Sequence, residues 1–319
     1  MNSQRKYVVS HAPFWHIGSG VPERHFNALI ALLPALIIGL SVFGIQALAV
    51  VCLSVASAIG WEAAFNKAAK QAISVGDGQA ALIGLLFGML LPATAPWWLV
   101  ITGTFVAIVI GKHIFGGIGS NPFNPVVLAF AILAISWKRH FDIDDQLLNF
   151  NFSFVAADPL TALKAFGAGA AAKYNLMDLF LGRQVGGIGA TCGLALTLGG
   201  IYLIVRGYLR WEVPVSFILG LVITAALFKV VDPTRFAGPF FHLFTGYALI
   251  GAFFLAPEDS SSPVNKIPML IYGAGGGIMV MLIRNIGAYS DGVIYAILVI
   301  NLINPLLDKI RPKAIGKVA

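Results

Sequence analysis

The chain alternates long apolar runs with short polar connections, which is the pattern of a protein that crosses a membrane several times. A helix needs about 20 apolar residues to cross a hydrocarbon core about 30 Å thick. Segments 79–91 and 124–137 are shorter and are predicted to be half-helices or short buried spans. In all, ten apolar segments can be delimited, at 26–45, 46–64, 79–91, 97–112, 124–137, 187–206, 212–231, 239–256, 268–284 and 291–308. The pattern predicts an all-α integral membrane protein with about ten transmembrane segments.

One long polar stretch, 138–186, divides these segments into two sets of five. LLPATAPWWLVITGTFVAIVIGKHIFGGIG in the first set is weakly similar to FLAPEDSSSPVNKIPMLIYGAGGGIMVMLIRNIG in the second. An odd number of spans per set inverts the second set, and inverted repeats place their sites near the midplane of the membrane. Chance similarity between two glycine-rich apolar stretches is the alternative. The predicted organisation is a cytoplasmic segment 1–25, a first repeat 26–137, an outer loop with a short helix 138–186, a second repeat 187–308 and a cytoplasmic tail 309–319.

The stretch from Gly111 to Pro125, GKHIFGGIGSNPFNP, interrupts the apolar pattern with glycine, asparagine and proline. Non-helical backbone survives at membrane depth only where protein buries it or where it lines a cavity. Asn121 and Asn124 are flanked by prolines, so they are predicted to line such a cavity or to cap a half-helix that begins near Pro125. The break indicates a site inside the membrane protein.

Composition supports the same class. Hydrophobic residues make up 58% of the chain and charged residues 11%, whereas about 25% of a soluble domain is charged. The net charge of +7 therefore indicates membrane orientation and no nucleic-acid partner. If Met1 is cytoplasmic and all ten segments cross, 13 of the 21 Lys and Arg residues lie inside, and five of the other eight lie in 138–186. We expect a multi-pass protein of the cytoplasmic (inner) membrane with both termini in the cytoplasm, and residues 1–25 contain no apolar stretch typical of a cleaved signal peptide.

The motif GKHIFGGIGSNPFNP resembles the GK-x-x-x-GG-x-G-x-N-x-FNP signature of the D subunit of Rnf electron-transport complexes and the B subunit of sodium-pumping NADH:quinone reductase. LIGLLFGMLLPATAPWW before it, and HLFTGYALIGAFFLAPEDSSSP and IRNIGAYSDGVIYAILVINLINPLLD after it, follow the order and spacing of that family. The resemblance implies one subunit of a membrane complex that passes electrons between ferredoxin and NAD while moving Na⁺ or H⁺. The other subunits of such a complex are the implied partners.

The resemblance also implies a flavin at the outer face. In the family, FMN is joined through its phosphate to a threonine in the motif S-G-A-T-P-L, and a noncovalent riboflavin is known in relatives. Here the motif reads VAADPL, with Asp158 at the threonine position. A carboxylate cannot form the phosphothreonyl ester, so covalent FMN is predicted to be absent there. Asp158 followed by Pro159 is also a typical start of a helix, and its charge would repel a phosphate from that helix N-terminus.

Two other threonines are alternative attachment points. Thr161 lies three residues after Asp158, and Thr191 lies in GGIGATCG, where its other role is a hydrogen bond to a backbone carbonyl one turn back. Glycines 186, 187 and 189 let another group approach the backbone closely. The predicted cofactor-binding residues, for FMN or riboflavin, are Asp158, Thr191, Gly189, Asn121 and Asn124.

Ion movement requires polar groups within the spans, and an ionisable residue there is a functional candidate. Glu258 stands where the family has the aspartate of A-T-D-P, although its neighbours differ, and it is retained with His113 as an ion-pathway candidate. Simpler interpretations apply to other ionisable residues: Glu62 is expected to pair with the 67–70 loop. Lysines 112 and 229 and Arg284 are expected to extend from segment ends towards water.

No motif of a soluble enzyme is present: the chain lacks GxSxG, HExxH, a Walker loop and CxxC, and its two cysteines do not form a metal-ligand pattern. No catalytic residue is assigned and no metal site is predicted. The alternative function is a channel or transporter on a five-plus-five repeat, as in urea and ammonium channels, without a redox centre. Loss of the flavin-bearing threonine favours that alternative, and a bound flavin would exclude it.

Overall fold

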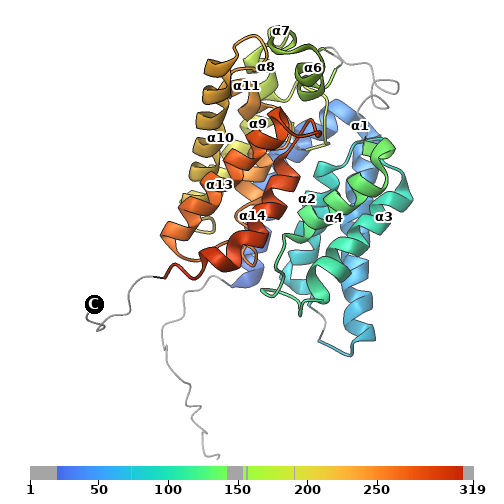
Figure 1. Ribbon diagram of the computed structural model, residues 1–319. Helices are drawn as coiled ribbons and strands as arrows, with labels where there is room; N and C mark the ends of the chain where they lie inside the picture. Colours follow the sequence, from blue (N-terminus) through green and yellow to red (C-terminus); the bar gives the residue numbers. More distant parts are fainter. Residues whose placement is uncertain (1–19, 73, 142–153, 156, 190, 312–319) are drawn as a thin grey trace, which may run out of the picture.

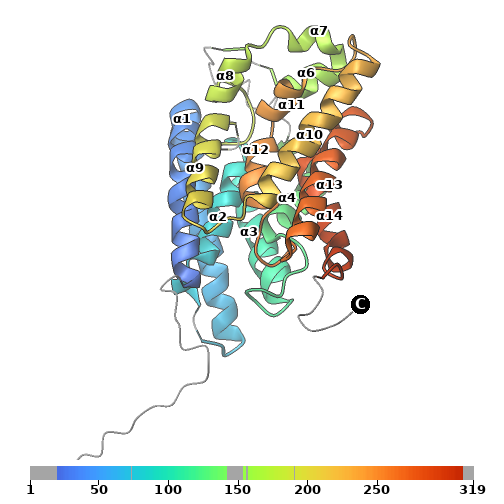
Figure 2. The same cartoon turned by 90° about the vertical axis from the view of Figure 1, so that its left-hand side faces the viewer.

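The computed structural model describes residues 20–72, 74–141, 154–155, 157–189 and 191–311, and within these ranges it contains helices and no strand. The longer helices stand side by side, and the short helices α6, α7 and α8 gather at one end of the bundle (Figure 1). The start of α1 and the end of α14 lie at the opposite end (Figure 2). We call these the connector end and the terminal end.

Helix α1 (Val21–Ala68) contains the two predicted segments 26–45 and 46–64. A straight helix of 48 residues would be about 72 Å long, but Gly44 interrupts it with φ 64° and ψ −148°. Glycine adopts a positive φ without steric cost. The chain reverses there, so the two limbs of α1 lie side by side and antiparallel (Figures 1 and 2).

The next segments contain half-length helices, as predicted. After the short turn η1 (Val75–Asp77), α2 (Gln79–Leu90) and α4 (Pro125–Ser136) have 12 residues each, about 18 Å of helix. Between them, α3 (Trp97–Phe105) continues as the π-helix η2 (Val106–His113). Irregular backbone separates the helices at 91–96 and 114–124.

The connector end consists of η3 (Lys138–Phe141), α6 (Pro159–Phe166), α7 (Ala168–Ala171) and α8 (Leu176–Leu181). Helix α6 is the short helix that the sequence predicted in the 138–186 stretch. A small apolar cluster fixes this layer on the bundle through Leu160, Leu163, Leu179, Ala237 and Phe241.

The second set of segments forms α9 (Gly193–Val205), α10 (Glu212–Val231), α11 (Pro239–Phe244), α12 (Ala248–Ile250), the π-helix η4 (Gly251–Leu255), α13 (Lys266–Asn285) and α14 (Val293–Leu307). Small residues let α10 and α13 pack backbone to backbone. A Cβ on Gly277 would lie 2.1 Å from the carbonyl oxygen of Phe217, and one on Gly220 would lie 2.4 Å from that of Ala274.

Several helices have the composition of membrane spans. By length and hydropathy, α1, α10 and α13 can cross a bilayer. The apolar side chains of Val205 in α9 and of Val230 and Val231 in α10 are about four-fifths exposed. Such exposure is expected for side chains that face lipid. The all-helical integral membrane class predicted from the sequence agrees with this fold.

The ends of the interrupted helices satisfy their backbone groups across the two sets. At the end of α2, the carbonyl of Met89 accepts from the amide of Gly189 (3.0 Å), and that of Leu91 accepts from the amide of Ile188 (3.1 Å). The carbonyl of Leu255, at the end of η4, accepts from the side chain of Asn124 (2.9 Å). Because the last carbonyls of a helix have no partner within it, these contacts allow both helices to end inside the protein.

Candidate functional site

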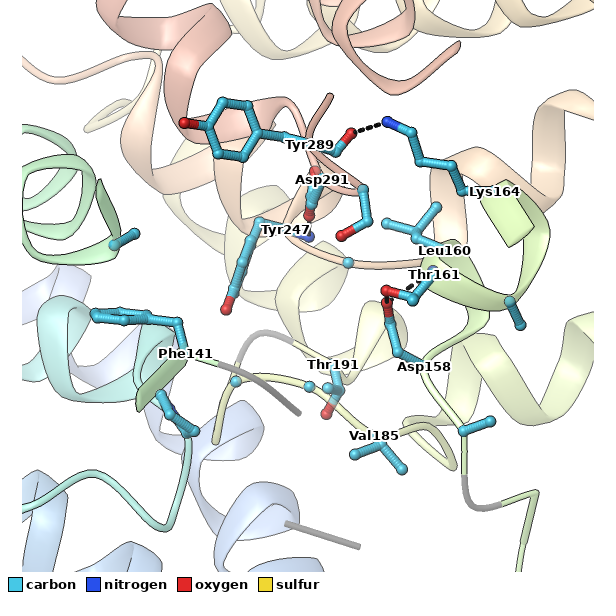
Figure 3. A pocket seen from close by; sticks show the side chains of 18 of the residues that line it. Phe141, Asp158, Leu160, Thr161, Lys164, Val185, Thr191, Tyr247, Tyr289 and Asp291 are labelled. Atoms are coloured by element: carbon cyan, nitrogen blue, oxygen red, sulfur yellow. Dashed lines mark hydrogen bonds between the residues drawn. The ribbon is translucent and has the colours of Figure 1, made fainter. Parts of the chain in front are cut away.

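A cavity of about 650 Å³ lies at the connector end, among α4, α6, residues 185–191 and residues 288–295. Its volume is within the range of small-molecule and cofactor sites, about 300–1,000 Å³. Figure 3 shows Tyr247, Thr191 and Asp158 around the same open space, with Phe141 on its far side. The cavity therefore contains two of the predicted cofactor-binding residues, Asp158 and Thr191.

Aromatic rings form two walls of this cavity. On one side Phe130 packs edge to face with Phe141 (centroids 5.0 Å apart) and with Tyr247 (5.5 Å). On another, the rings of Tyr289 and Tyr295 lie 4.3 Å apart. Such walls suit a planar, conjugated ligand, because aromatic pairs at these separations are attractive in stacked and edge-to-face arrangements.

Asp158 caps α6, as the sequence predicted. Its Oδ2 accepts hydrogen bonds from the amide of Thr161 (2.8 Å) and from the hydroxyl of Thr161 (2.5 Å), and Pro159 is the first helical residue. Burial raises the pKa of the Asp158 carboxyl, the two bonds from Thr161 lower it, and the nearby Asp291 raises it again. The carboxylate therefore occupies the N-terminus of α6, and the Thr161 hydroxyl is already engaged.

Asp291 is a central residue of this site that the sequence analysis missed. Its Oδ2 accepts from the amide of Tyr247 (2.7 Å), and its Oδ1 accepts from the amide of Val293 (3.1 Å) and from the guanidinium of Arg284 (3.0 Å). Arg284 also donates to the carbonyl of His242 (2.6 Å). The expectation that Arg284 extends towards water is wrong: its side chain is buried and paired. The sequence contained a signal for this ion pair, because Arg284 and Asp291 are the only charged residues between Lys266 and Asp308.

Lys164 connects α6 to the segment between α13 and α14. Its Nζ donates to the carbonyls of Gly287 (2.6 Å) and Tyr289 (2.7 Å). Partial burial lowers the pKa of Lys164. This link holds α6 against the tyrosine wall of the cavity.

The glycines before Thr191 serve backbone packing. A Cβ on Gly189 would lie 2.3 Å from the Met89 side chain, and one on Gly187 would lie 2.7 Å from the carbonyl of Leu90. The close approach predicted at these glycines is present, and the approaching group is the end of α2. Gly189 is not among the residues that line the cavity, whereas Thr191 and Gly187 are.

Asn121 and Asn124 lie away from this cavity. Asn124 caps α4, as predicted, by accepting from the amides of Val126 (2.9 Å) and Val127 (3.2 Å). Asn121 donates from Nδ2 to the two carboxylate oxygens of Glu258 (3.3 Å each), and Glu258 also accepts from the amide of Ser261 (2.9 Å). The structure thus brings Asn121 together with the ion-pathway candidate Glu258.

His113 lies next to a buried ion pair. Its ring stacks on Phe65 (4.4 Å between centroids), and its Nε2 has no partner among the described residues. The ammonium of Lys112 lies 2.8 Å and 3.0 Å from the carboxylate oxygens of Glu62, and both side chains are buried. The expectations that Lys112 extends towards water and that Glu62 pairs with the 67–70 loop are therefore wrong. No described contact joins His113 to Glu258.

These features define a class of protein: an all-helical integral membrane protein with interrupted helices, an aromatic cavity at one end and buried ionisable residues elsewhere in the bundle. Across the described ranges, no cluster of three or more His, Cys, Asp or Glu residues is arranged to hold a metal ion.

Comparison with known proteins identifies the family. The model of the NQR2, RnfD, RnfE family matches residues 8–316. The chain is 38% identical to the D subunit of the Na(+)-translocating ferredoxin:NAD(+) oxidoreductase complex of Acetobacterium woodii, over 91% of this chain and 88% of that protein. It is 35% identical to the D subunit of the proton-translocating ferredoxin:NAD(+) oxidoreductase complex of Clostridium ljungdahlii, over 95% and 94% respectively. It is 31% identical to the D subunit of the ion-translocating oxidoreductase complex of Pectobacterium atrosepticum, over 97% and 99%.

The chain belongs to the NQR2, RnfD, RnfE family, and the membership predicted from its motifs is confirmed. Its relatives are subunits of ion-translocating oxidoreductases, the class of translocase expected from the sequence.

Proposed function

We propose that this protein is the membrane subunit of an Rnf-type complex that couples flavin-mediated electron transfer between ferredoxin and NAD to movement of Na⁺ or H⁺. The names of the Acetobacterium and Clostridium relatives support the electron-transfer reaction, and they specify sodium in one case and protons in the other. The observation that carries the redox part is the cavity around Asp158, because this position corresponds to the flavin-bearing threonine of the family.

The cavity residues fit a flavin that is held without a covalent bond. The rings of Phe141, Tyr247 and Tyr289 offer stacking surfaces, and Thr191 lines the same space. When bound, a flavin would supply one- and two-electron transfer, while the protein sets its position and its electrostatic surroundings. A phosphoester at residue 158 does not fit, because the residue is a carboxylate that already accepts two bonds from Thr161.

We also propose that ions pass near the point where the two sets of segments meet. Glu258 there is bonded to Asn121, and the Tyr272 hydroxyl lies 2.5 Å from the Asn301 side chain and donates to the carbonyl of Ala256 (3.2 Å). Carboxylate, amide and hydroxyl oxygens are ligands of hard cations, and a carboxylate can also carry a proton. His113 is the second candidate.

The proposed topology has ten membrane segments in two inverted sets of five, with the terminal end in the cytoplasm and the connector end outside. It is supported by the antiparallel limbs of α1, by the half-helices α2 and α4, and by the position of both described chain ends at one end of the bundle. In this orientation the cavity around Asp158 opens on the outer side of an inner membrane.

The absorption spectrum of the purified complex, combined with denaturation, tests the redox part. We expect flavin absorption in the native complex and release of the flavin of this subunit into the supernatant after denaturation in acid. A complete, active complex in which this subunit carries no flavin would instead support an ion-conducting subunit without a redox centre.

A further inference from the structure

A second cavity, of about 310 Å³, adjoins the first along α6. The two cavities share Leu160, Lys164 and Ser290 in their linings. The second is bounded on its other sides by residues 235–236 before α11, by His242 within α11 and by the end of α13. These shared residues therefore form the wall where the two cavities meet, at the side of α6.

The two cavities differ in charge. The second is lined by three cations, Lys164, Arg235 and Arg284, and by no aspartate or glutamate among its described lining residues. The first is lined by the two carboxylates Asp158 and Asp291 and by two lysines, Lys138 and the shared Lys164. A negatively charged group is therefore favoured in the second cavity and repelled from the α6 N-terminus, where Asp158 lies.

The three cations are not equally available. Arg284 is paired with Asp291, and Lys164 binds two backbone carbonyls, which neutralise none of its charge. Arg235 is exposed, and its guanidinium lies 5.3 Å from the centre of the Phe236 ring. Its planar fork of donors is suited to phosphate.

Two polar side chains of this cavity lack partners. His242 is 1% exposed, and neither its Nδ1 nor its Nε2 is hydrogen-bonded within the described part of the chain. The buried Nδ2 of Asn285 also has no partner there. A neutral imidazole always carries one donor nitrogen, and Nδ2 is a donor. Since buried polar groups are nearly always satisfied, these donors point to a ligand with acceptor oxygens.

We propose that this basic pocket, formed by Lys164, Arg235, His242 and Asn285, binds the phosphate of a phosphate monoester. The ligand is FMN, held without a covalent bond, with its ring system in the larger cavity. The proposal rests on the proposed function of that larger cavity. It explains how the chain holds an FMN phosphate although Asp158 has replaced the threonine: the phosphate lies beside α6 and not at its N-terminus.

Flavin binding by the flavin-depleted complex, followed by fluorescence quenching in lipid nanodiscs, tests this assignment. We expect FMN to bind at least about tenfold more tightly than riboflavin, because a charge-assisted phosphate contact is worth at least that factor. Inorganic phosphate should compete with FMN and not with riboflavin. Equal affinities for the two flavins would overturn the proposal.

Two variants locate the phosphate. Arg235→Ala and Asn285→Asp should each weaken FMN about tenfold or more while changing riboflavin affinity less than twofold. Arg206→Ala is the matched control, because Arg206 is also exposed, also faces a neighbouring aromatic ring (Tyr208, 5.9 Å) and lies at the terminal end. If Arg206→Ala weakens FMN as much as Arg235→Ala does, the phosphate is not in this pocket.

Two further outcomes separate the pocket from the larger cavity. If neither flavin binds, the proposed function of the larger cavity fails, and loss of inorganic phosphate binding in Arg235→Ala would still assign the pocket to phosphate.

Nanodiscs of phosphatidic acid, compared with phosphatidylcholine alone, test a lipid source of the phosphate. If phosphatidic acid competes and the two flavins bind with equal affinity, the ligand of the pocket is a lipid headgroup and not FMN.

Discussion

At the scale of single residues, Asp158 sets both the structure and the chemistry of the α6 N-terminus. Aspartate is as good a cap as threonine, and it satisfies the amide of Thr161. The same carboxylate places a negative charge near Asp291 in the cavity proposed for flavin. The residue that caps the helix is therefore one whose carboxylate cannot form a phosphothreonyl ester.

Asp158→Asn is expected to remove one pH dependence of stability. Burial raises the folded-state pKa of Asp158 above its ordinary value of 3.8, so the folded chain binds this proton more tightly than the unfolded chain. Stability from this group is therefore lost as the pH rises from 3.8 through the raised pKa. Asparagine keeps the cap and has no charge, so the variant should lose less thermal stability than the wild type between pH 4 and 7, measured in detergent.

Asp232→Asn provides a control of opposite sign. Asp232 lies just after α10, and the hydrogen bond from Thr234 lowers its pKa. Its contribution to stability is therefore present above its unfolded pKa and lost as the pH falls through the lowered value. If both variants show the same dependence of stability on pH as the wild type, neither carboxyl causes that dependence.

The buried pair of Glu62 and Lys112 gives a second prediction at this scale. Glu62→Leu alone should destabilise the protein by about 3–5 kcal/mol, because it leaves an unpaired ammonium in the interior. The double variant Glu62→Leu/Lys112→Met should be markedly more stable than the single one. Thermal unfolding of both variants measures the difference in stability. If the double variant is destabilised by the sum of the two single substitutions, Glu62 and Lys112 do not interact directly.

The exposed pair of Arg183 and Asp178 is the comparison for that prediction. Its side chains are 64% and 40% exposed, and its atoms lie 3.1 Å apart. Surface ion pairs contribute about 0–1 kcal/mol. Asp178→Ala should therefore change stability by less than about 1 kcal/mol.

At the scale of elements, the interrupted helices are the distinctive feature. Two π-helices, η2 and η4, lead into the breaks that carry Asn121 and Glu258. π-helical turns are rare and are often found at functional sites. The end of η4 is satisfied from the other set of segments by Asn124, whereas the end of η2 is satisfied by the amides of Gly116 and Gly117 in its own break.

The contact between α10 and α13 depends on glycine. Gly277→Ala should destabilise the protein by about 1–3 kcal/mol, because its Cβ would lie 2.1 Å from the carbonyl oxygen of Phe217 and would force the helices apart. Gly60→Ala, inside α1, has no atom within 4 Å of the added Cβ and should be neutral or slightly stabilising. Thermal unfolding of the two variants compares them, and equal effects would contradict tight packing at Gly277.

At the scale of the whole molecule, the two sets of segments pack together, with candidate sites at both ends of the bundle. The connector end carries the aromatic cavity and the basic pocket, and the break at Asn121 is joined to Glu258. Arg24, near the start of α1, forms an ion pair with Asp259, which follows Glu258. The arrangement separates the proposed redox site from the proposed ion pathway within a single chain.

The proposed orientation can be tested by labelling single cysteines in intact cells. In a background with Cys52 and Cys192 replaced by serine, Lys173→Cys at the connector end should react with a membrane-impermeant maleimide added from outside. Lys309→Cys at the terminal end should react only after the membrane is permeabilised. The reverse pattern would contradict cytoplasmic termini.

Much of the fold could be read from the sequence because burial in lipid imposes strong local rules. The apolar runs locate the helices, their lengths identify the short helices α2 and α4, and Asp158-Pro159 and Asn124-Pro125 mark two helix starts. The GGIGSNPFNP motif identified the family. These properties depend on neighbouring residues only.

The partners of the buried charges were decided by the tertiary structure. Glu62 meets Lys112 across 50 positions of the chain, and Lys164 meets the carbonyl of Gly287 across 123. Which groups face each other depends on how whole helices pack, and no local pattern of residues encodes that. The sequence by itself determined that Asp158 caps a helix and cannot carry the phosphoester, because both properties depend on the residue and its neighbours. Only the tertiary structure created the aromatic cavity and the basic pocket, because both depend on how α6 packs on α11 and on the segment between α13 and α14.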